Sequence, residues 1–166
     1  MASDTKMVRI KLSILIPAAI LLVLLVAIII LSQPGDKGRI SLDSFFTTGN
    51  ITLENNNASS IFSVYLAETI PQQLQGYMNQ SSIGDCGNRK DCIGMLFLFG
   101  NVSQQCFWMA NTEIPLEQSW IAQNGIVTYA YEAQAYSTKN VCANGTMVLE
   151  TLPGRIAIGD TVKLNS

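Results

Sequence analysis

The residues best suited to chemistry lie in one short segment of the chain, between Phe107 and Glu117. Aromatic faces beside amide, hydroxyl and carboxylate groups suit a sugar or another small polar ligand. A strand on which Trp108 and Met109 alternate between core and surface, with a turn after it, explains the same pattern without a ligand. We predict a ligand-binding site at Trp108, Met109, Asn111, Thr112, Glu113 and Glu117.

Acid–base chemistry would have to rest on carboxylates, because the chain contains no histidine. That absence excludes Ser-His-Asp and Cys-His catalysis and most zinc sites. A glycosidase needs two carboxylates held about 5–10 Å apart across a cleft. Glu113 and Glu117 flank an Ile-Pro-Leu turn and are the first pair to consider. The full set of candidates is Glu68, Glu113, Glu117, Glu132, Glu150 and Asp160.

The four cysteines are Cys86, Cys92, Cys106 and Cys142. An even number in an exported domain indicates disulfides, and four cysteines allow three pairings. Cys86 and Cys92 are placed to close a small loop, and Cys106 with Cys142 would then join distant segments. Metal binding is the alternative, but the spacing is too wide for a zinc knuckle and no histidine can assist. We predict no metal and no other cofactor.

Five Asn-x-Ser/Thr triplets follow the apolar N-terminal segment. In a host that glycosylates surface proteins, they are candidate acceptors, although an Asn- and Ser-rich sequence also produces them by chance. The candidate acceptors are Asn50, Asn57, Asn79, Asn101 and Asn144.

The segment Ile14–Leu31 carries no charge and no hydrogen-bonding side chain, and Leu12 and Ser13 extend it. This length suffices to cross ~30 Å of hydrocarbon as a helix. We predict a transmembrane helix at 12–31 that contacts membrane lipid, after a cytoplasmic basic arm at 1–11. The protein would be a single-pass protein of the cell membrane, with its C-terminal domain outside. A cleaved signal peptide is the alternative, and it too would export the domain.

The exported part is predicted to be mostly β, a small barrel or sandwich with one or two short helices. Residues 32–60 should form a linker and weak strands with a turn near Gly49-Asn50, and residues 61–166 the β-rich domain. Thr69 is placed to cap a short helix that has Pro71 in its first turn. Asn124-Gly125 predicts a hairpin. Further strands are predicted at 61–67, 94–99, 105–110, 116–122, 126–133, 146–152 and 161–164.

From Gly94 onward the sequence resembles the family catalogued as domain of unknown function 192. The resemblance rests on GMLFLF at 94–99, FWM-NT at 107–112 and IPLE at 114–117, with matching flanks from Ile61 to Leu164. It implies a compact β-rich fold, often preceded by a signal peptide or anchor, and brings no established activity. Two basic positions of the family are neutral here, as Gln80 and Ala110. If relatives bind an anion through them, this chain does not do so in the same way.

Charge gives no reason to expect nucleic acid as a partner, because the net charge is −2 and only 13% of residues are charged. We therefore expect a non-enzymatic module of the cell envelope that binds a glycan, another small polar ligand or a partner. Two alternatives remain open. One is an accessory subunit of a larger membrane complex, and the other is a carboxylate-dependent hydrolase of surface carbohydrate.

Overall fold

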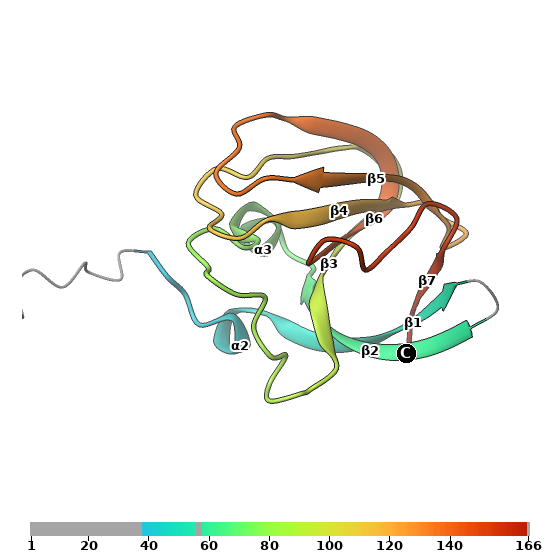
Figure 1. Cartoon of the computed structure of the whole chain (residues 1–166), viewed down its shortest axis with the longest axis horizontal. Coiled ribbons are helices and arrows are strands. Elements are labelled where there is room, and N and C mark those ends of the chain that lie inside the picture. The colour runs from blue at the N-terminus through green and yellow to red at the C-terminus, as the bar shows by residue number, and fades with distance from the viewer. Residues whose placement is uncertain (1–37, 56–57, 166) are drawn as a thin grey trace, which may run out of the picture. The chain divides into compact units, whose positions relative to one another are not determined.

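The computed structural model describes residues 38–55 and 58–165, which form one mostly β unit with two short helices (Figure 1). The helices are α2 (Leu42–Phe45) and α3 (Ile70–Gln75). The strands are β1 (Thr47–Asn55), β2 (Ala58–Ala67), β3 (Cys92–Phe107), β4 (Leu116–Ile121), β5 (Val127–Ala133), β6 (Val141–Thr151) and β7 (Thr161–Leu164).

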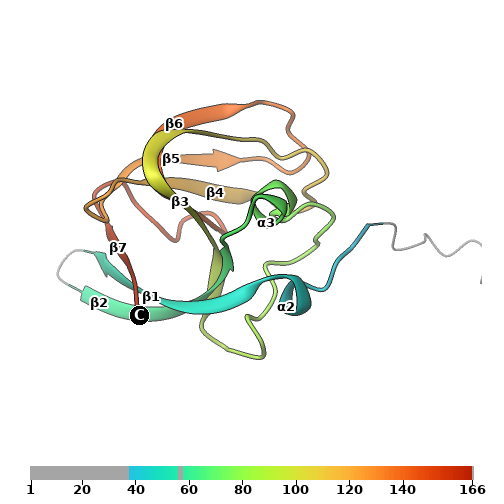
Figure 2. The same ribbon diagram turned by 180° about the vertical axis from the view of Figure 1, so that it is seen from behind.

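All seven strands belong to one sheet with the order β5-β4-β6-β3-β2-β1-β7. Every pair is antiparallel except β2 and β3, which run parallel and are joined by a crossover that contains α3. The sheet curves into a half-barrel, visible from both sides in Figures 1 and 2. A bridge between Ile126 and Thr161 links the start of β5 to β7, at the two ends of the strand order. The mostly β prediction is confirmed, and the half-barrel is the form it takes.

Alternate residues of the strands pack into two cores on opposite faces of the sheet. We call one the aliphatic core, because its buried members among the described residues are all Ile, Leu or Val. They are Ile51, Leu53, Val64, Leu66, Ile93, Leu96, Ile121, Val127, Leu149, Ile156 and Val162. We call the other the aromatic core. Its buried members are Leu42, Phe46, Tyr65, Ala67, Tyr77, Cys86, Met95, Phe97, Met109, Leu116, Trp120, Ala133, Val141 and Val148.

The short helix α3 begins as its sequence predicts. The Thr69 side chain accepts from the Gln72 backbone N–H, and the Gln72 side chain accepts from the Thr69 backbone N–H, which completes a capping box. Pro71 lies in the first turn, where a missing donor costs little. The helix ends at Gly76, whose φ of +44° lets the chain turn back against Phe97. The predicted helix is therefore confirmed, together with its cap.

The hairpin at Asn124-Gly125 is also confirmed, since β4 and β5 pair antiparallel on either side of it and Gly125 has a φ of +85°. The predicted turn at Gly49-Asn50 is wrong, because both residues lie inside β1 and pair with β2. Strands predicted at 94–99 and 105–110 are one strand, β3, which is interrupted only by a register shift between Leu98 and Ser103. Continuous pairing with β6 on both sides of the shift explains why the polar residues between them do not end the strand.

The predicted basic arm, the transmembrane helix at 12–31 and the first part of the linker lie outside the described residues, as does Asn57. Within 38–55 and 58–165, neither helix has the length and apolar character needed to cross a membrane. The later part of the predicted linker contributes α2 and β1, so the folded unit begins at Gly38.

Candidate functional site

A pocket opens between α3, the segment that follows it, and β3. Its volume is about 260 Å³, which is of the size of a small organic ligand. Most of its lining residues are apolar or aromatic, but polar and apolar atoms share the exposed wall about equally, and the polar side chains include three amides and one carboxyl group. The lining residues are Ile70, Gln73, Leu74, Gln75, Gly76, Tyr77, Met78, Phe97, Phe99, Gln105, Cys106, Phe107, Trp108, Thr112 and Glu150.

Three phenylalanines of β3 form one aromatic wall. Phe107 meets Phe97 edge-to-face with ring centroids 4.9 Å apart, and it meets Phe99 at 6.3 Å. Phe97 and Phe107 are ten positions apart, yet β3 curves sharply between them, as Figure 2 shows. The bend occurs at the register shift after Leu98. Curvature of a single strand thus brings the rings together.

Helix α3 forms the opposite wall and is tied to β3 by a side chain. Gln73 Nε2 donates to the carbonyl oxygen of Leu98 at 2.7 Å. The helix leaves Ile70 72% and Leu74 73% exposed, both in the pocket lining. Trp108, just past the end of β3, is 57% exposed and also lines the pocket. Large apolar side chains therefore remain exposed to solvent around this pocket.

Glu150 on β6 places a buried carboxyl group in the pocket wall, with a residue exposure of 4%. Its hydrogen-bond partner is the side chain of Gln118 on β4, whose Nε2 donates to Oε1 at 3.1 Å. No Lys or Arg side chain among the described residues pairs with it. Burial raises the pKa of Glu150 to about 7, and the Gln118 hydrogen bond opposes part of that rise. The carboxyl group is therefore poised to change charge near neutral pH.

Two further polar groups surround this carboxyl group. Tyr77 is buried and donates its hydroxyl hydrogen to the Ile83 carbonyl oxygen at 3.2 Å. Burial, with a contribution from nearby Glu150, raises the pKa of Tyr77 well above its ordinary value. The Gln118 side chain is buried too, and its Oε1 has no hydrogen-bond partner in the described part of the chain. Burying such a cluster costs free energy of folding, which indicates that it serves a purpose other than stability.

Of the six predicted ligand-binding residues, the structure brings two into this pocket, Trp108 and Thr112. Met109 is buried in the aromatic core, where its sulfur accepts from Gln118 Nε2 at 3.5 Å. Asn111 adopts a φ of +59° in the turn, and its carbonyl oxygen accepts from the Asn79 backbone N–H at 2.6 Å. Trp108 and Met109 do alternate between surface and core, as a strand and turn would require.

The two predicted carboxylates serve separate structural contacts. Glu113 forms an ion pair with Arg39 at 3.4 Å. Glu117 is buried and accepts from the backbone N–H groups of Gly154 at 2.8 Å and Ile156 at 3.1 Å. It therefore stabilises the loop before β7. Neither residue lines the pocket, so they do not form the carboxylate pair considered for hydrolysis.

The residues that sequence reasoning left out of the site are Glu150, Gln118 and Tyr77. Glu150 was one of several candidate carboxylates, with nothing to single it out. The available signal was its place in the predicted strand 146–152, where alternation puts it on the same face as Val148. A carboxylate on the core face of a strand is unusual and points to a function or a buried partner. In the described residues, no three potential metal-ligating side chains converge on one point.

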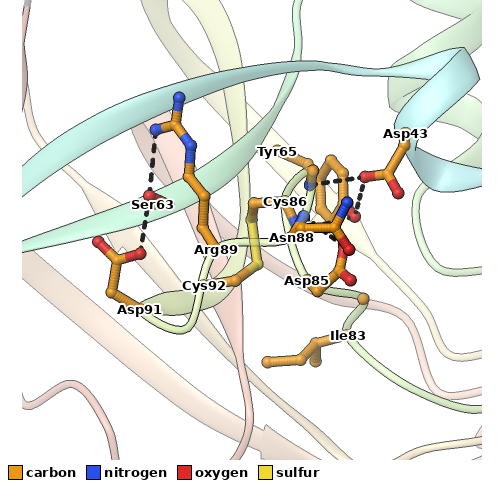
Figure 3. The surroundings of a disulfide bond; sticks show 12 residues. Asp43, Ser63, Tyr65, Ile83, Asp85, Cys86, Asn88, Arg89, Asp91 and Cys92 are labelled. Carbon is orange, nitrogen blue, oxygen red and sulfur yellow. Dashed lines mark hydrogen bonds between the residues drawn. A yellow bond between two sulfur atoms is a disulfide. The ribbon is translucent and has the colours of Figure 1, made fainter.

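The cysteines pair as Cys86–Cys92 and Cys106–Cys142, which confirms the prediction of disulfides. The second bond joins directly opposed residues of β3 and β6, and Cys106 lines the pocket. The first closes the loop drawn in Figure 3, where the Tyr65 hydroxyl donates to Asp43 at 2.6 Å. The same hydroxyl accepts from the Cys86 backbone N–H at 2.9 Å.

The glycosylation candidates within the described residues differ in their surroundings. Asn101 and Asn144 are exposed on β3 and β6. Asn50 Oδ1 accepts from Arg89 at 2.6 Å and from the Ser63 hydroxyl at 3.3 Å, and Asn79 Nδ2 donates to the Gly38 carbonyl oxygen. A glycan on either of the last two would disturb these contacts. Their use as acceptors stays a prediction.

The described residues thus form a β half-barrel domain with an aromatic pocket that contains a buried carboxyl group. Residues 51–164 match the model of the DUF192 family, described as "Uncharacterized ACR". The chain belongs to this family, as its resemblance from Ile61 to Leu164 implied. No curated protein matches the chain.

Two solved structures have a similar fold. One, from Sinorhizobium meliloti 1021, is a protein proposed to be a transcription regulator. It is 24% identical, with 76% of this chain and 98% of that chain covered and a TM-score of 0.64. The other is a protein of unknown function from Novosphingobium aromaticivorans DSM 12444. It is 23% identical, with 76% and 99% covered and a TM-score of 0.60. At this level of identity, the likeness shows the fold alone.

Proposed function

We propose that this protein is a non-enzymatic ligand-binding module of the cell envelope. Residues 12–31 anchor it in the cell membrane and hold the folded domain at the outer face of that membrane. Its ligand enters the pocket between α3 and β3. The proposal for the pocket rests on Glu150, and the proposal for the location rests on the apolar segment 12–31 and on the two disulfides.

The observation that carries the proposal is a buried carboxyl group without a cation, in the wall of an open aromatic pocket. In a purely structural role, an apolar residue at position 150 would pack beside Val148 at no desolvation cost. A perturbed carboxyl group in a pocket is a mark of a functional site. The exposed Trp108 side chain adds a large face against which a ligand can pack.

Binding is favoured over hydrolysis by the contents of the pocket. Glycoside hydrolysis in its usual form needs two carboxyl groups on either side of the scissile bond. Among the described residues that line the pocket, Glu150 alone has a carboxyl side chain. Glu113 and Glu117 are engaged elsewhere. A small ligand with a polar group remains the expected occupant.

The test is a ligand screen against the full-length protein, observed by thermal shift and by ligand-detected NMR. A hit that depends on the pocket should weaken at least tenfold in Trp108→Ala. The matched control is Ile158→Ala, because Ile158 is 64% exposed and is not in the pocket lining. A hit that both variants retain would contradict the pocket. Purification of the protein from membranes in a fixed assembly, with no ligand bound by the free protein, would instead support the accessory-subunit alternative.

A further inference from the structure

The pocket has an electrostatic character that narrows the choice of ligand. Glu150 is the one lining residue, among those described, that can carry a full charge near neutral pH. Lys and Arg are absent from the lining, so nothing in the pocket attracts a phosphate or a carboxylate. The ionised form of Glu150 has an amide as its partner and no counter-charge. An incoming cation would supply that counter-charge.

The aromatic residues provide a second feature that suits a cation. Phe97, Phe99 and Phe107 line the pocket together, and Trp108 adds an exposed indole. The faces of such rings carry partial negative charge and attract ammonium groups, with Trp the best of them. Combined with a carboxylate, aromatic rings can hold an organic cation without any hydrogen bond from the ligand.

Each amide side chain of the pocket already donates at least one hydrogen bond within the protein. Gln73 Nε2 donates to the Leu98 carbonyl oxygen at 2.7 Å, and Gln75 Nε2 donates to the Met78 carbonyl oxygen at 2.9 Å. Gln105 Nε2 donates to the Ser103 hydroxyl oxygen at 2.7 Å. A sugar would need a polar partner for each of its several hydroxyl groups. An alkylammonium ion makes no such demand.

We infer that the ligand of this pocket carries an organic ammonium group, a quaternary ammonium or an amine on a short apolar stem. The cationic head lies against the Glu150 carboxylate among the rings of Phe99, Phe107 and Trp108, and the stem contacts the apolar side chains of α3. This inference rests on the proposed function, because it names the chemical class that the same pocket takes.

The proposal makes a prediction about pH with a definite sign. A cation binds the ionised form of Glu150, so its entry releases a proton wherever Glu150 is protonated. The group facing Glu150 from the segment after α3 is Tyr77, whose pKa is raised well above its ordinary value, so it stays neutral. From β4 the facing group is the Gln118 amide, which does not titrate. With a pKa of about 7 for Glu150, affinity should rise with pH and level off above that value.

The experiment compares choline with 3,3-dimethylbutan-1-ol, its uncharged isostere, by NMR titration of the full-length protein. Choline should bind roughly tenfold more tightly at pH 8 than at pH 6, since about a tenth of Glu150 is ionised at the lower pH and about nine-tenths at the higher. The alcohol should show no such gain. Glu150→Gln should weaken choline and remove its pH dependence, whereas Glu132→Gln, exposed on β5, should change neither.

Phosphocholine and butylamine, titrated in the same way, are two further probes that define the source of the ammonium group. Phosphocholine that binds as well as choline would point to a lipid headgroup, and weaker phosphocholine binding would point to a free amine. Both results support an ammonium ligand. Equal binding of the alcohol and choline at pH 8, tighter choline binding at pH 6, or no binding of choline or butylamine would overturn it. A Trp108-dependent neutral hit from the ligand screen would then leave the proposed function standing without this inference.

Discussion

The aliphatic core and the aromatic core use the same strands and differ in what they bury. On β6, Leu149 lies in the aliphatic core, while Val148 lies in the aromatic core and Glu150 on the same face as Val148. The aliphatic core draws residues from all seven strands, and its buried members have no polar side-chain atoms. The aromatic core, by contrast, has the polar side chains of Gln118, Thr112 and Glu150 buried beside its apolar residues. We call this side of the molecule the aromatic face.

This difference shows where the fold is stabilised and where it tolerates a cost. Burial of aliphatic side chains contributes about 25 cal/mol per Å² with no polar group to satisfy. On the other face, Glu150 and Gln118 must be desolvated, and Gln118 Oε1 has no partner among the described residues. A stable half-barrel thus supports a face that is available for binding.

The largest effect is expected from the aliphatic core. Leu149→Ala should lower the free energy of unfolding by about 2–5 kcal/mol, because it removes fully buried methyl groups and leaves a cavity. Leu152→Ala is the control, since Leu152 is 37% exposed, and its effect should be within about 1 kcal/mol. Urea denaturation of both variants measures the difference. Similar losses in the two variants would contradict the assignment of this core.

Glu150 should make stability depend on pH. Its pKa rises from 4.5 to about 7 on folding, so between these values the folded state holds a proton that the unfolded state has lost. The free energy of unfolding should therefore fall as pH increases from about 4.5 to 7, by about 3 kcal/mol in total, and level off above.

Denaturation of the wild-type protein and of Glu150→Gln at pH 5, 6 and 7 measures this contribution. In Glu150→Gln, the free energy of unfolding should lose the part of its pH dependence that Glu150 causes. In Glu132→Gln, this pH dependence should be retained. A wild-type slope that survives in Glu150→Gln would show that another group is responsible and that the aromatic face does not hold a titrating carboxyl group.

A smaller effect separates the two buried glutamates. Glu117→Gln replaces a carboxylate that accepts from Gly154 and Ile156 with a side chain that has one acceptor oxygen, at a cost of about 1–3 kcal/mol. Ligand binding should be unchanged, because Glu117 is not in the pocket lining. Denaturation and the ligand titration together check this. Loss of binding with unchanged stability would assign Glu117 to the site instead.

Much of the local structure could be predicted because short-range rules decide it. The capping box at Thr69 and Gln72 places α3, and Asn124-Gly125 places the hairpin. The ends of β1 and β3 were misjudged. The predicted turn at Gly49-Asn50 is extended because both residues pair with β2, whereas the predicted gap between 94–99 and 105–110 is a register shift within β3 at which pairing with β6 is interrupted and resumes. Strand pairing within the sheet outweighed the local preference for a turn at Gly49-Asn50.

The candidate site was predictable only in part. Trp108 and Thr112 were found because aromatic and polar residues adjoin in one segment, and the same reasoning included Glu113 and Glu117, which bind other groups. In the sequence, a glutamate that lies in an outer turn cannot be distinguished from one that lies in a pocket. Only the set of atoms that surrounds each one distinguishes them.

The sequence by itself determined the mostly β character, the cap of α3, the family and the four cysteines from which the disulfides form. These features depend on residue types within a few positions of one another or, for the family, on a stretch of sequence that matches the family's signature. Tertiary structure decided that Glu150 faces Gln118 and Tyr77 and that Phe97 meets Phe107. The bend of β3, the crossover through α3 and the place of β6 between β3 and β4 bring these groups together. Burial and charge arise from the whole assembly of strands, so no local pattern carries them.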